Sequence, residues 1–111
     1  MQIEFPDEDT KILFNSTKAL IRAFGADNAK VVRRRLDDLR AVPTLEAARG
    51  LPGKLEELKG GRKGQFSMRA VGALRLIFKP SAAPPPQKDD GGLDWAQIRA
   101  ITILELGDYH D

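Results

Sequence analysis

The sequence predicts an α+β domain, in which an N-terminal strand and an antiparallel helical hairpin pack on a small, mainly antiparallel β-sheet. Apolar residues recur at helical spacing between residues 7 and 41, and they alternate with polar residues between residues 65 and 79. A third segment, residues 98 to 106, is rich in Ile and Leu and is typical of a buried strand. A chain of 111 residues has the size of a single domain.

The first expected elements are a short strand and a helix. Polar and apolar residues alternate over residues 2 to 5, which predicts a strand that ends at Pro6. Residues 7 to 24 show helical spacing, and the acidic first turn suits the helix dipole. The pattern therefore predicts one continuous helix that stops at Gly25.

A second helix is expected over residues 27 to 41, with its first aspartate as the N-cap. Its spacing allows Arg33 to pair with Asp37, and Arg34 with Asp38. The three consecutive arginines at residues 33 to 35 therefore indicate mainly a salt-bridged helix surface. Direct contact with nucleic acid is the alternative. The short loop before this helix predicts a helical hairpin.

The clearest strand pattern spans residues 65 to 79. A two-residue turn would mix the apolar and polar faces of the two strands, whereas a three-residue turn at residues 71 to 73 keeps them matched. We therefore expect Arg69 to lie near Arg75, and both to share with Ser67 the sheet face opposite the core.

The remaining segments are a short extended stretch and a long connection. Residues 55 to 58 suggest a short strand or an extended approach to the next loop. Residues 80 to 95 are rich in Pro and Gly and predict a flexible insertion between two strands. The last strand is expected over residues 98 to 106, with Gly107 at its end.

Composition excludes several classes of site. The chain has no cysteine, so neither disulfides nor thiolate metal sites can form, and its single histidine argues against a structural zinc site. No cofactor or metal is expected. We find no signal-peptide pattern and no long apolar run, so we expect a cytoplasmic protein without membrane association.

The net charge of +2 is uninformative, but its distribution is uneven. Residues 59 to 79 contain six basic residues and no acidic one. Such a segment points to a polyanionic partner, with an ordinary solvated surface as the alternative. The basic residues are Lys59, Arg62, Lys63, Arg69, Arg75 and Lys79.

Several residues suit RNA cleavage by a 2′-hydroxyl, which needs a base, an acid and cations near the phosphate. His110 is the only side chain whose ordinary pKa lies near neutrality. Tyr109 can stack on a base or donate a proton, Asp108 can orient a neighbour, and Glu56 can act as a base. Each also has a plainer reading as a surface or strand-end residue. The glycine-rich loop at residues 60 to 64 permits close approach of a phosphate, or is simply a tight turn.

Three blocks of this sequence resemble HigB toxins, which belong to the RelE/ParE superfamily of type II toxin–antitoxin systems. Residues 55 to 69 resemble the L-x-x-L-K-G-D-R-K-G core of that family and the aromatic, serine and arginine positions that follow it. Residues 74 to 78 are similar to its W-R-I-x-F strand. The ending Asp108-Tyr109-His110 matches its C-terminal D-Y-H. The blocks occur in the family's order.

The resemblance implies a RelE-like fold over the whole chain and a metal-independent endoribonuclease. Such toxins enter the ribosomal A site, cleave the mRNA there by 2′-hydroxyl attack and arrest translation. The implied partners are the ribosome, mRNA and a HigA-type helix-turn-helix antitoxin, through which alone operator DNA is contacted. Proton transfer would fall to His110 and Tyr109, with support from Asp108. Binding of phosphate and RNA would fall to Arg69, Arg75, Lys59, Arg62, Lys63 and Lys79.

The chain also departs from the family pattern. Gly61 replaces an aspartate, Glu56 stands where some relatives have histidine, and Leu74 replaces an aromatic residue. Two alternatives therefore remain open. One is a ParE-like gyrase inhibitor that does not cleave RNA, against which His110 argues. The other is a catalytically weakened toxin that acts only as the binding partner of an antitoxin.

Overall fold

The computed structural model of the protein describes residues 1–108 and confirms the predicted α+β class. Five strands and three helices follow the expected order, with three short 3-10 turns between them. The helices and strands are β1 (Gln2–Glu4), α1 (Glu8–Asn15), α2 (Thr17–Phe24), α3 (Ala26–Ala41), β2 (Glu56–Glu57), β3 (Phe66–Arg69), β4 (Leu74–Pro80) and β5 (Ala100–Asp108). The 3-10 turns are η1 (Ala47–Gly50), η2 (Gly60–Arg62) and η3 (Trp95–Gln97).

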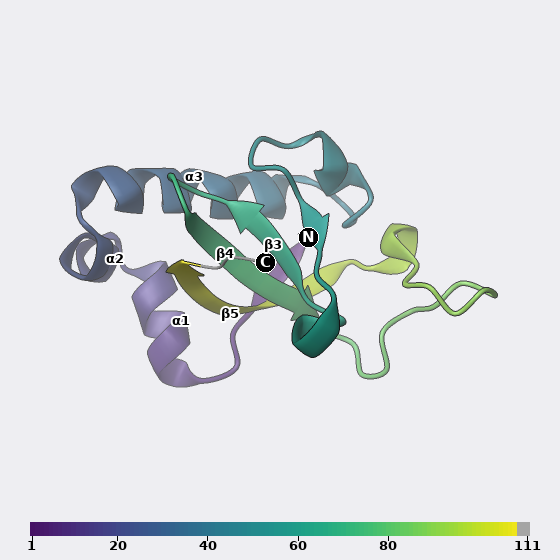
Figure 1. Cartoon of the computed structure of the whole chain (residues 1–111). Helices are drawn as coiled ribbons and strands as arrows, with labels where there is room; N and C mark the ends of the chain where they lie inside the picture. The colour runs from purple at the N-terminus through teal and green to yellow at the C-terminus, as the bar shows by residue number, and fades with distance from the viewer. Residues whose placement is uncertain (109–111) are drawn as a thin grey trace.

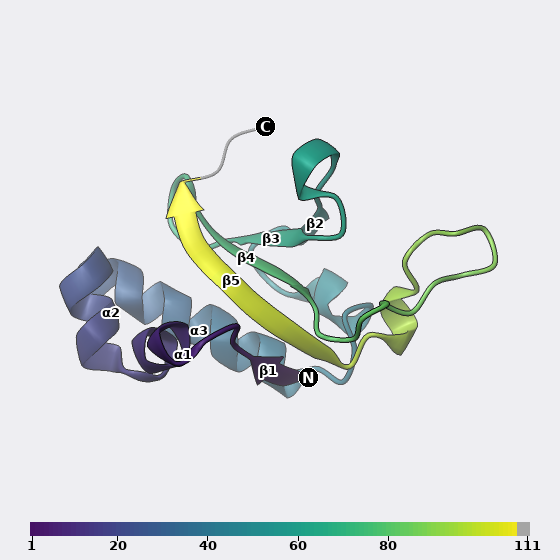
Figure 2. The ribbon, with the colours of Figure 1, turned by 90° about the horizontal axis from the view of Figure 1, so that it is seen from below.

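The strands form one mixed sheet in the order β1-β5-β4-β3-β2. All neighbours are antiparallel except β1 and β5, which are parallel. The three helices lie on one side of this sheet, and η2 rises on the other side near β2 (Figures 1 and 2). None of the helices within residues 1–108 is long and apolar enough to cross a membrane.

The main core lies between the sheet and the helices. Leu36 and Leu39 of α3 are fully buried, as are Phe66 and Phe78 of the facing strands. The two phenylalanine rings stack with their centroids 5.9 Å apart. Burying each of these side chains contributes about 1.5–3 kcal/mol, so the shared core holds the sheet against α3.

The first helical segment is interrupted, so the prediction of one helix over residues 7 to 24 is wrong. Ser16 adopts an extended backbone conformation between α1 and α2. Its hydroxyl accepts a hydrogen bond from the backbone N–H of Ala19 at 3.0 Å, which begins a new helix. Serine side chains compete in this way with the helical hydrogen bonds of the backbone, and hydrophobic spacing does not reveal it.

Helix α3, the second helix that the sequence predicts, begins earlier than expected, because its N-cap is Gly25 and not Asp27. Gly25 also ends α2, and its φ of 89° lies in the region that glycine adopts without steric cost. One residue therefore closes one helix and opens the next, so the two helices turn back sharply on each other. Asp27 stands instead in the first turn of α3, where its charge suits the helix dipole.

The ion pairs on α3 differ from the expected ones. Asp37 pairs with Arg40 at 3.6 Å, and Asp38 with Arg35 at 3.9 Å. Both are spaced by three residues, so the predicted four-residue pairs of Asp37 and Asp38 with the preceding arginines are wrong. The Arg35 side chain also reaches the sheet, where it contacts the end of β3.

The β3–β4 hairpin has the predicted register. The backbone N–H of Ala70 donates to the carbonyl of Leu74 at 2.9 Å, which closes a three-residue turn. Arg69 consequently pairs with Arg75, and Met68 with Leu76. Met68 and Leu76 are fully buried in the core, so the matching of faces is confirmed.

Strand β5 contains an irregularity that the predicted regular strand over residues 98 to 106 did not include. Ile77 pairs with Glu105 but Phe78 pairs with Ile103, so Leu104 has no partner on β4. Such a bulge reverses which residues face the core. Ile103 faces inward before it and Leu106 after it, and the strand continues through Gly107, beyond its expected end.

The insertion leaves the sheet after Pro80, and the chain rejoins the sheet at Ala100, after the η3 turn that begins at Trp95. Pro80 is buried at the end of β4 and pairs with Ile101. The Trp95 indole contacts Phe66 edge to face at 5.1 Å and donates a hydrogen bond to Glu57 at 3.0 Å. Between these anchors the chain projects away from the helices (Figure 2).

Replacing Ser16 by alanine should lower the free energy of unfolding by about 1 kcal/mol, because the first N–H groups of α2 lose their cap. Urea titration followed by circular dichroism measures this change. Thr17→Ala, one residue further on and exposed, is the matched control and should change stability by less than about 0.5 kcal/mol. Equal stability of the two variants would contradict the capping role.

Candidate functional site

One face of the sheet lies away from the helices and is here called the outer face (Figure 2). Two arginines occupy paired positions on this face. Arg69 on β3 pairs with Arg75 on β4, and side-chain alternation places both opposite to core residues Met68 and Leu76. Directly paired residues have Cβ atoms about 5 Å apart. On the far side of Arg75 the partner on β5 is Gly107, which has no side chain to crowd the guanidinium group.

Within residues 1–108, neither of these arginines forms an ion pair. Like charges directly opposite on a sheet repel each other and lower stability. An anion on the outer face would relieve this repulsion, and arginine binds phosphate oxygens through two parallel hydrogen bonds. Arg69 and Arg75, called below the arginine pair, therefore form a site suited to a phosphate group.

The backbone of Arg69 is held from two directions. Its N–H donates to the carbonyl of Gly53 at 2.6 Å, and its carbonyl accepts from Arg35 Nε at 3.0 Å. Arg35 reaches this point from α3 and also contacts Asp38. Arg69 thus stands at the end of β3 with a fixed main chain and an exposed side chain.

Gly53 is required for this arrangement. Its φ is 109°, a conformation that residues with a side chain rarely adopt. An added Cβ would lie 2.8 Å from the carbonyl oxygen of Arg69 and 2.7 Å from the Met68 side chain. The close approach of this loop to β3 is therefore open only to glycine.

Glu56 also faces outward, because it pairs with Ser67 on β3. Its carboxylate contacts the ammonium group of Lys54 at 3.3 Å and remains partly exposed. Ser67 lies on the outer face as predicted, but it is only 2% exposed. Leu58 and Ile77 are buried next to it and do not belong to the main core, so this part of the outer face has a cover of its own.

The cover is the basic loop, residues 59 to 64, which folds over the outer face at η2 (Figure 2). Arg62 crosses from this loop to the sheet and contacts Glu105 of β5 at 2.7 Å. Lys59 and Lys63 are exposed and form no ion pair within residues 1–108. Two ammonium groups without an ion-pair partner in the described part of the chain therefore accompany the arginine pair.

Lys79 stands apart from the arginine pair. It shares the outer face of β4 but lies four residues beyond Arg75, or about 13 Å along the strand. Its partner on β5 is Thr102, at the end of the sheet where the insertion begins. Lys79 is therefore not part of the arginine pair's immediate surroundings.

Asp108 does not share a face with the arginine pair. It pairs with Leu74, and alternation beyond the bulge places it on the helix side of the sheet, whereas Gly107 lies beside Arg75. Tyr109 and His110 lie outside the described residues, so their proposed roles in proton transfer stay predictions.

Glu105 was missed by the sequence reasoning. Two-residue alternation from Ile101 and Ile103 would turn this carboxylate into the core, where it has no suitable partner. The bulge at Leu104 instead turns it to the outer face, where it meets Arg62. An acidic residue at an inward position of an apolar strand was the one available signal.

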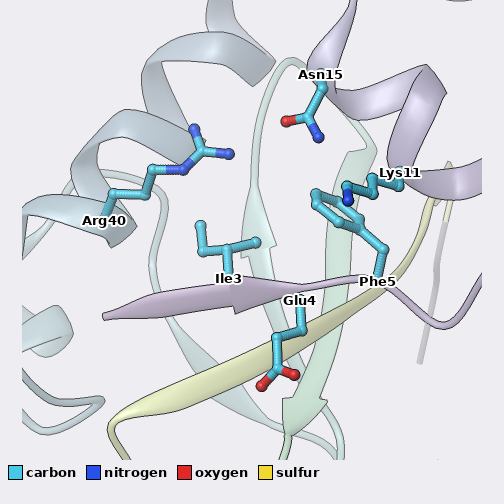
Figure 3. Close-up of a pocket in the computed structure, with 6 residues that line it drawn as sticks. All are labelled: Ile3, Glu4, Phe5, Lys11, Asn15 and Arg40. Atoms are coloured by element: carbon cyan, nitrogen blue, oxygen red, sulfur yellow. The ribbon is translucent and has the colours of Figure 1, made fainter. Parts of the chain in front are cut away.

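A separate cleft lies at the edge of the sheet, between β1 and helices α1 and α3 (Figure 3). Lys11 and Arg40 border it above Ile3, which points toward the helices, whereas Glu4 points to the opposite side of β1. The cleft is thus on the other side of the sheet from the arginine pair. No group of three metal-ligating side chains occurs in the part of the chain that the structure describes.

Comparison with known proteins identifies similar structures but no similar sequence: no family model and no curated protein matches the chain. A YoeB/ParE toxin from Agrobacterium tumefaciens superposes with a TM-score of 0.59 at 13% identity, covering 99% of this chain and all of the other. YoeB in a YoeB–YefM complex from Staphylococcus aureus gives 0.56 at 18% identity, covering 100% of this chain and 98% of the other. A YoeB dimer from Staphylococcus aureus gives 0.54 at 20%, with the same coverage.

The chain therefore has the fold of YoeB/ParE-type toxins over its whole length. At these identities the likeness concerns the fold. The expected RelE-like architecture is confirmed, with the helices on one side of the sheet and the arginine pair on the other.

Replacing Gly53 by alanine should lower the free energy of unfolding by at least about 2 kcal/mol, because a strained backbone and a collision with the carbonyl of Arg69 add together. Gly50→Ala is the control, since its added methyl group meets open space and its φ is ordinary. Thermal or urea unfolding measures both, and a similarly small effect for the two would disprove the close approach.

Replacing Arg69 by glutamine should raise the free energy of unfolding by about 0.2–1 kcal/mol at low salt, because the repulsion from Arg75 disappears. The gain should fade in about 1 M salt, which screens exposed charges. Arg40→Gln, which breaks an ion pair with Asp37, should bring no gain. A loss of stability in Arg69→Gln at low salt would argue against an unrelieved like-charge contact.

Proposed function

We propose that this chain is the toxin of a type II toxin–antitoxin system, a HigB-like endoribonuclease that cleaves mRNA in the ribosomal A site. The observation that carries the proposal is the arginine pair, two arginines at directly paired strand positions without an acidic partner in residues 1–108. The resemblance of residues 55 to 69 to HigB toxins and the toxin-like fold support the same function.

Cleavage would follow the ordinary chemistry of RNA transesterification. A base takes the proton from the 2′-hydroxyl, the 2′-oxygen forms a bond to phosphorus, and the bond to the 5′-oxygen breaks. An acid protonates that leaving oxygen, which gives a 2′,3′-cyclic phosphate and a 5′-hydroxyl. All electrons stay with oxygen and phosphorus, so the step needs no oxidant or reductant.

The residues of the outer face suit these roles. Arg69 and Arg75 would bind the non-bridging phosphoryl oxygens, whose negative charge increases in the transition state. Glu56 projects from the same face and is the candidate base. His110 and Tyr109, carried over from the resemblance, would supply the acid, with Asp108 holding the strand end that leads to them.

The proposed partners follow from the same resemblance. The ribosome would supply the mRNA, and Lys59, Lys63 and Lys79 would bind its backbone beyond the scissile phosphate. A helix-turn-helix antitoxin of the HigA type would hold the toxin inactive and carry any contact with operator DNA. The YoeB–YefM complex from Staphylococcus aureus supports an antitoxin partner in general.

Expression of the protein alone should arrest growth, and Arg69→Ala or Arg75→Ala should lower the rate of mRNA cleavage by about 10²-fold, because one transition-state contact is lost. Primer extension on transcripts, before and after induction, measures the cuts, and the double variant Arg69→Ala/His110→Ala should abolish them. Arg22→Ala, an exposed position on α2 among the helices, is the matched control and should leave cleavage intact.

The alternatives predict different results in the same experiment. Growth arrest with DNA damage but without codon-linked cuts would identify a ParE-like gyrase inhibitor. Normal growth on strong expression would identify a weakened toxin that only binds its antitoxin. Unchanged cleavage in both arginine variants would remove the arginine pair from the mechanism.

A further inference from the structure

The contact between Arg62 and Glu105 joins two distant parts of the outer face. One guanidinium nitrogen of Arg62 lies 2.7 Å from a carboxylate oxygen of Glu105, and the other donates to Gln65 at 3.0 Å. Gln65 is next to β3 and Glu105 is on β5, so the guanidinium group is held across the intervening strand β4. A hydrogen-bonded ion pair of this kind fixes direction as well as distance.

The bulge in β5 makes this contact possible. Leu104 is the extra residue of the bulge, so Glu105 pairs with Ile77, whose side chain also faces outward. The carboxylate therefore projects on the same side of the sheet as the basic loop.

The part of the outer face next to this ion pair is buried. Leu58, Ser67 and Ile77 are at most 4% exposed, although the helices cover only the other face. Ile77 lies between Ser67 and Glu105 in one row across the sheet, beneath the span that Arg62 bridges. The apolar part of a long arginine side chain can cover such a surface while its charged end remains partly in water.

We infer that Glu105 is a positioning residue of the proposed RNA site, holding the basic loop over the outer face through Arg62. Arg62 then acts within the protein, and the exposed Lys59 and Lys63 are the loop residues that meet RNA phosphates. The inference rests on the proposed function. It adds an acidic residue on which RNA binding depends and assigns Arg62 a role other than phosphate ligand.

The inference predicts an effect on RNA affinity opposite to the one expected from charge alone. Removing a carboxylate from a surface that binds a polyanion ordinarily strengthens binding, because repulsion falls. If Glu105 positions the loop, its removal weakens binding instead. Glu4 provides the matched comparison, because it also faces outward on β1, pairs with Thr102, and forms no ion pair within residues 1–108 (Figure 3).

The test uses the full chain and a short single-stranded RNA with 2′-O-methyl riboses, which binds but cannot be cleaved. Fluorescence anisotropy gives the Kd over a series of salt concentrations. Glu105→Ala and Glu105→Gln should each weaken binding about 5- to 10-fold and flatten the dependence of log K on log salt, because fewer phosphates are neutralised. Glu4→Ala should leave the Kd unchanged or lower it.

An exchange of the two charges tests the ion pair directly. Arg62→Glu alone should weaken binding, and Arg62→Glu combined with Glu105→Arg should recover most of the lost affinity, because the loop is again held to β5. If Arg62 binds phosphate itself, the exchanged protein should bind no better than the single variant, which would overturn the inference.

Other outcomes separate this inference from the proposed function. Tighter or unchanged binding in both Glu105 variants overturns the inference while RNA binding by the wild type stands. No binding by the wild type, or no loss on Arg69→Ala/Arg75→Ala, counts against the proposed function instead. Circular dichroism and thermal unfolding of each variant confirm that it is folded, and Glu105→Gln keeps the size of the side chain.

Discussion

The outer face depends on the register of the β3–β4 hairpin. Side chains alternate along a strand, so a shift of one residue would turn Arg69 and Arg75 into the core and bring Met68 and Leu76 into water. The three-residue turn closed by Ala70 prevents this shift. The same register that buries the core therefore exposes the arginine pair, and stability and site cannot vary independently here.

The hairpin holds the two guanidinium-bearing residues of the arginine pair next to each other, although their like charges repel. The main chain of Arg69 is held by Gly53 and Arg35, while its side chain is left without an acidic partner in the described part of the chain. Arg62 differs from the arginine pair, because its guanidinium group contacts Glu105 on β5. Charge on this face is thus divided between groups left available for an anion and groups used to hold the loop.

Much of the fold was predictable from the sequence, because periodic burial leaves a periodic pattern. The alternation in residues 65 to 79 gave the correct hairpin register, and with it the position of the arginine pair. The break at Ser16 was not predictable in this way, because a single hydroxyl decides it while the apolar spacing runs on. The prediction of the α3 ion pairs was wrong for a related reason. Tertiary contacts, such as that of Arg35 with β3, decide whether a side chain pairs with a residue three or four positions away.

The candidate site was predictable only in part, because one inserted residue in β5 reverses the sides of all that follow. The bulge at Leu104 is signalled only by the acidic residue that follows it, yet it brings Glu105 to the outer face and places Asp108 on the helix side. Motif resemblance had grouped Asp108 with the cations by their shared presence in the family pattern. Face and proximity, however, are properties of the backbone path, which a motif does not contain.

The anchors of the insertion have a consequence for how this chain can change. Pro80 pairs with Ile101, Ser81 bonds to Ala100, and Trp95 is fastened to Glu57, so both ends of the excursion are attached before it leaves the sheet. Lengthening a loop between fixed ends costs little, about 0.6 kcal/mol for each doubling. Residues 82 to 92 can therefore be lengthened or shortened while the sheet keeps its shape. They offer a region where new contacts can be acquired without disturbing the arginine pair.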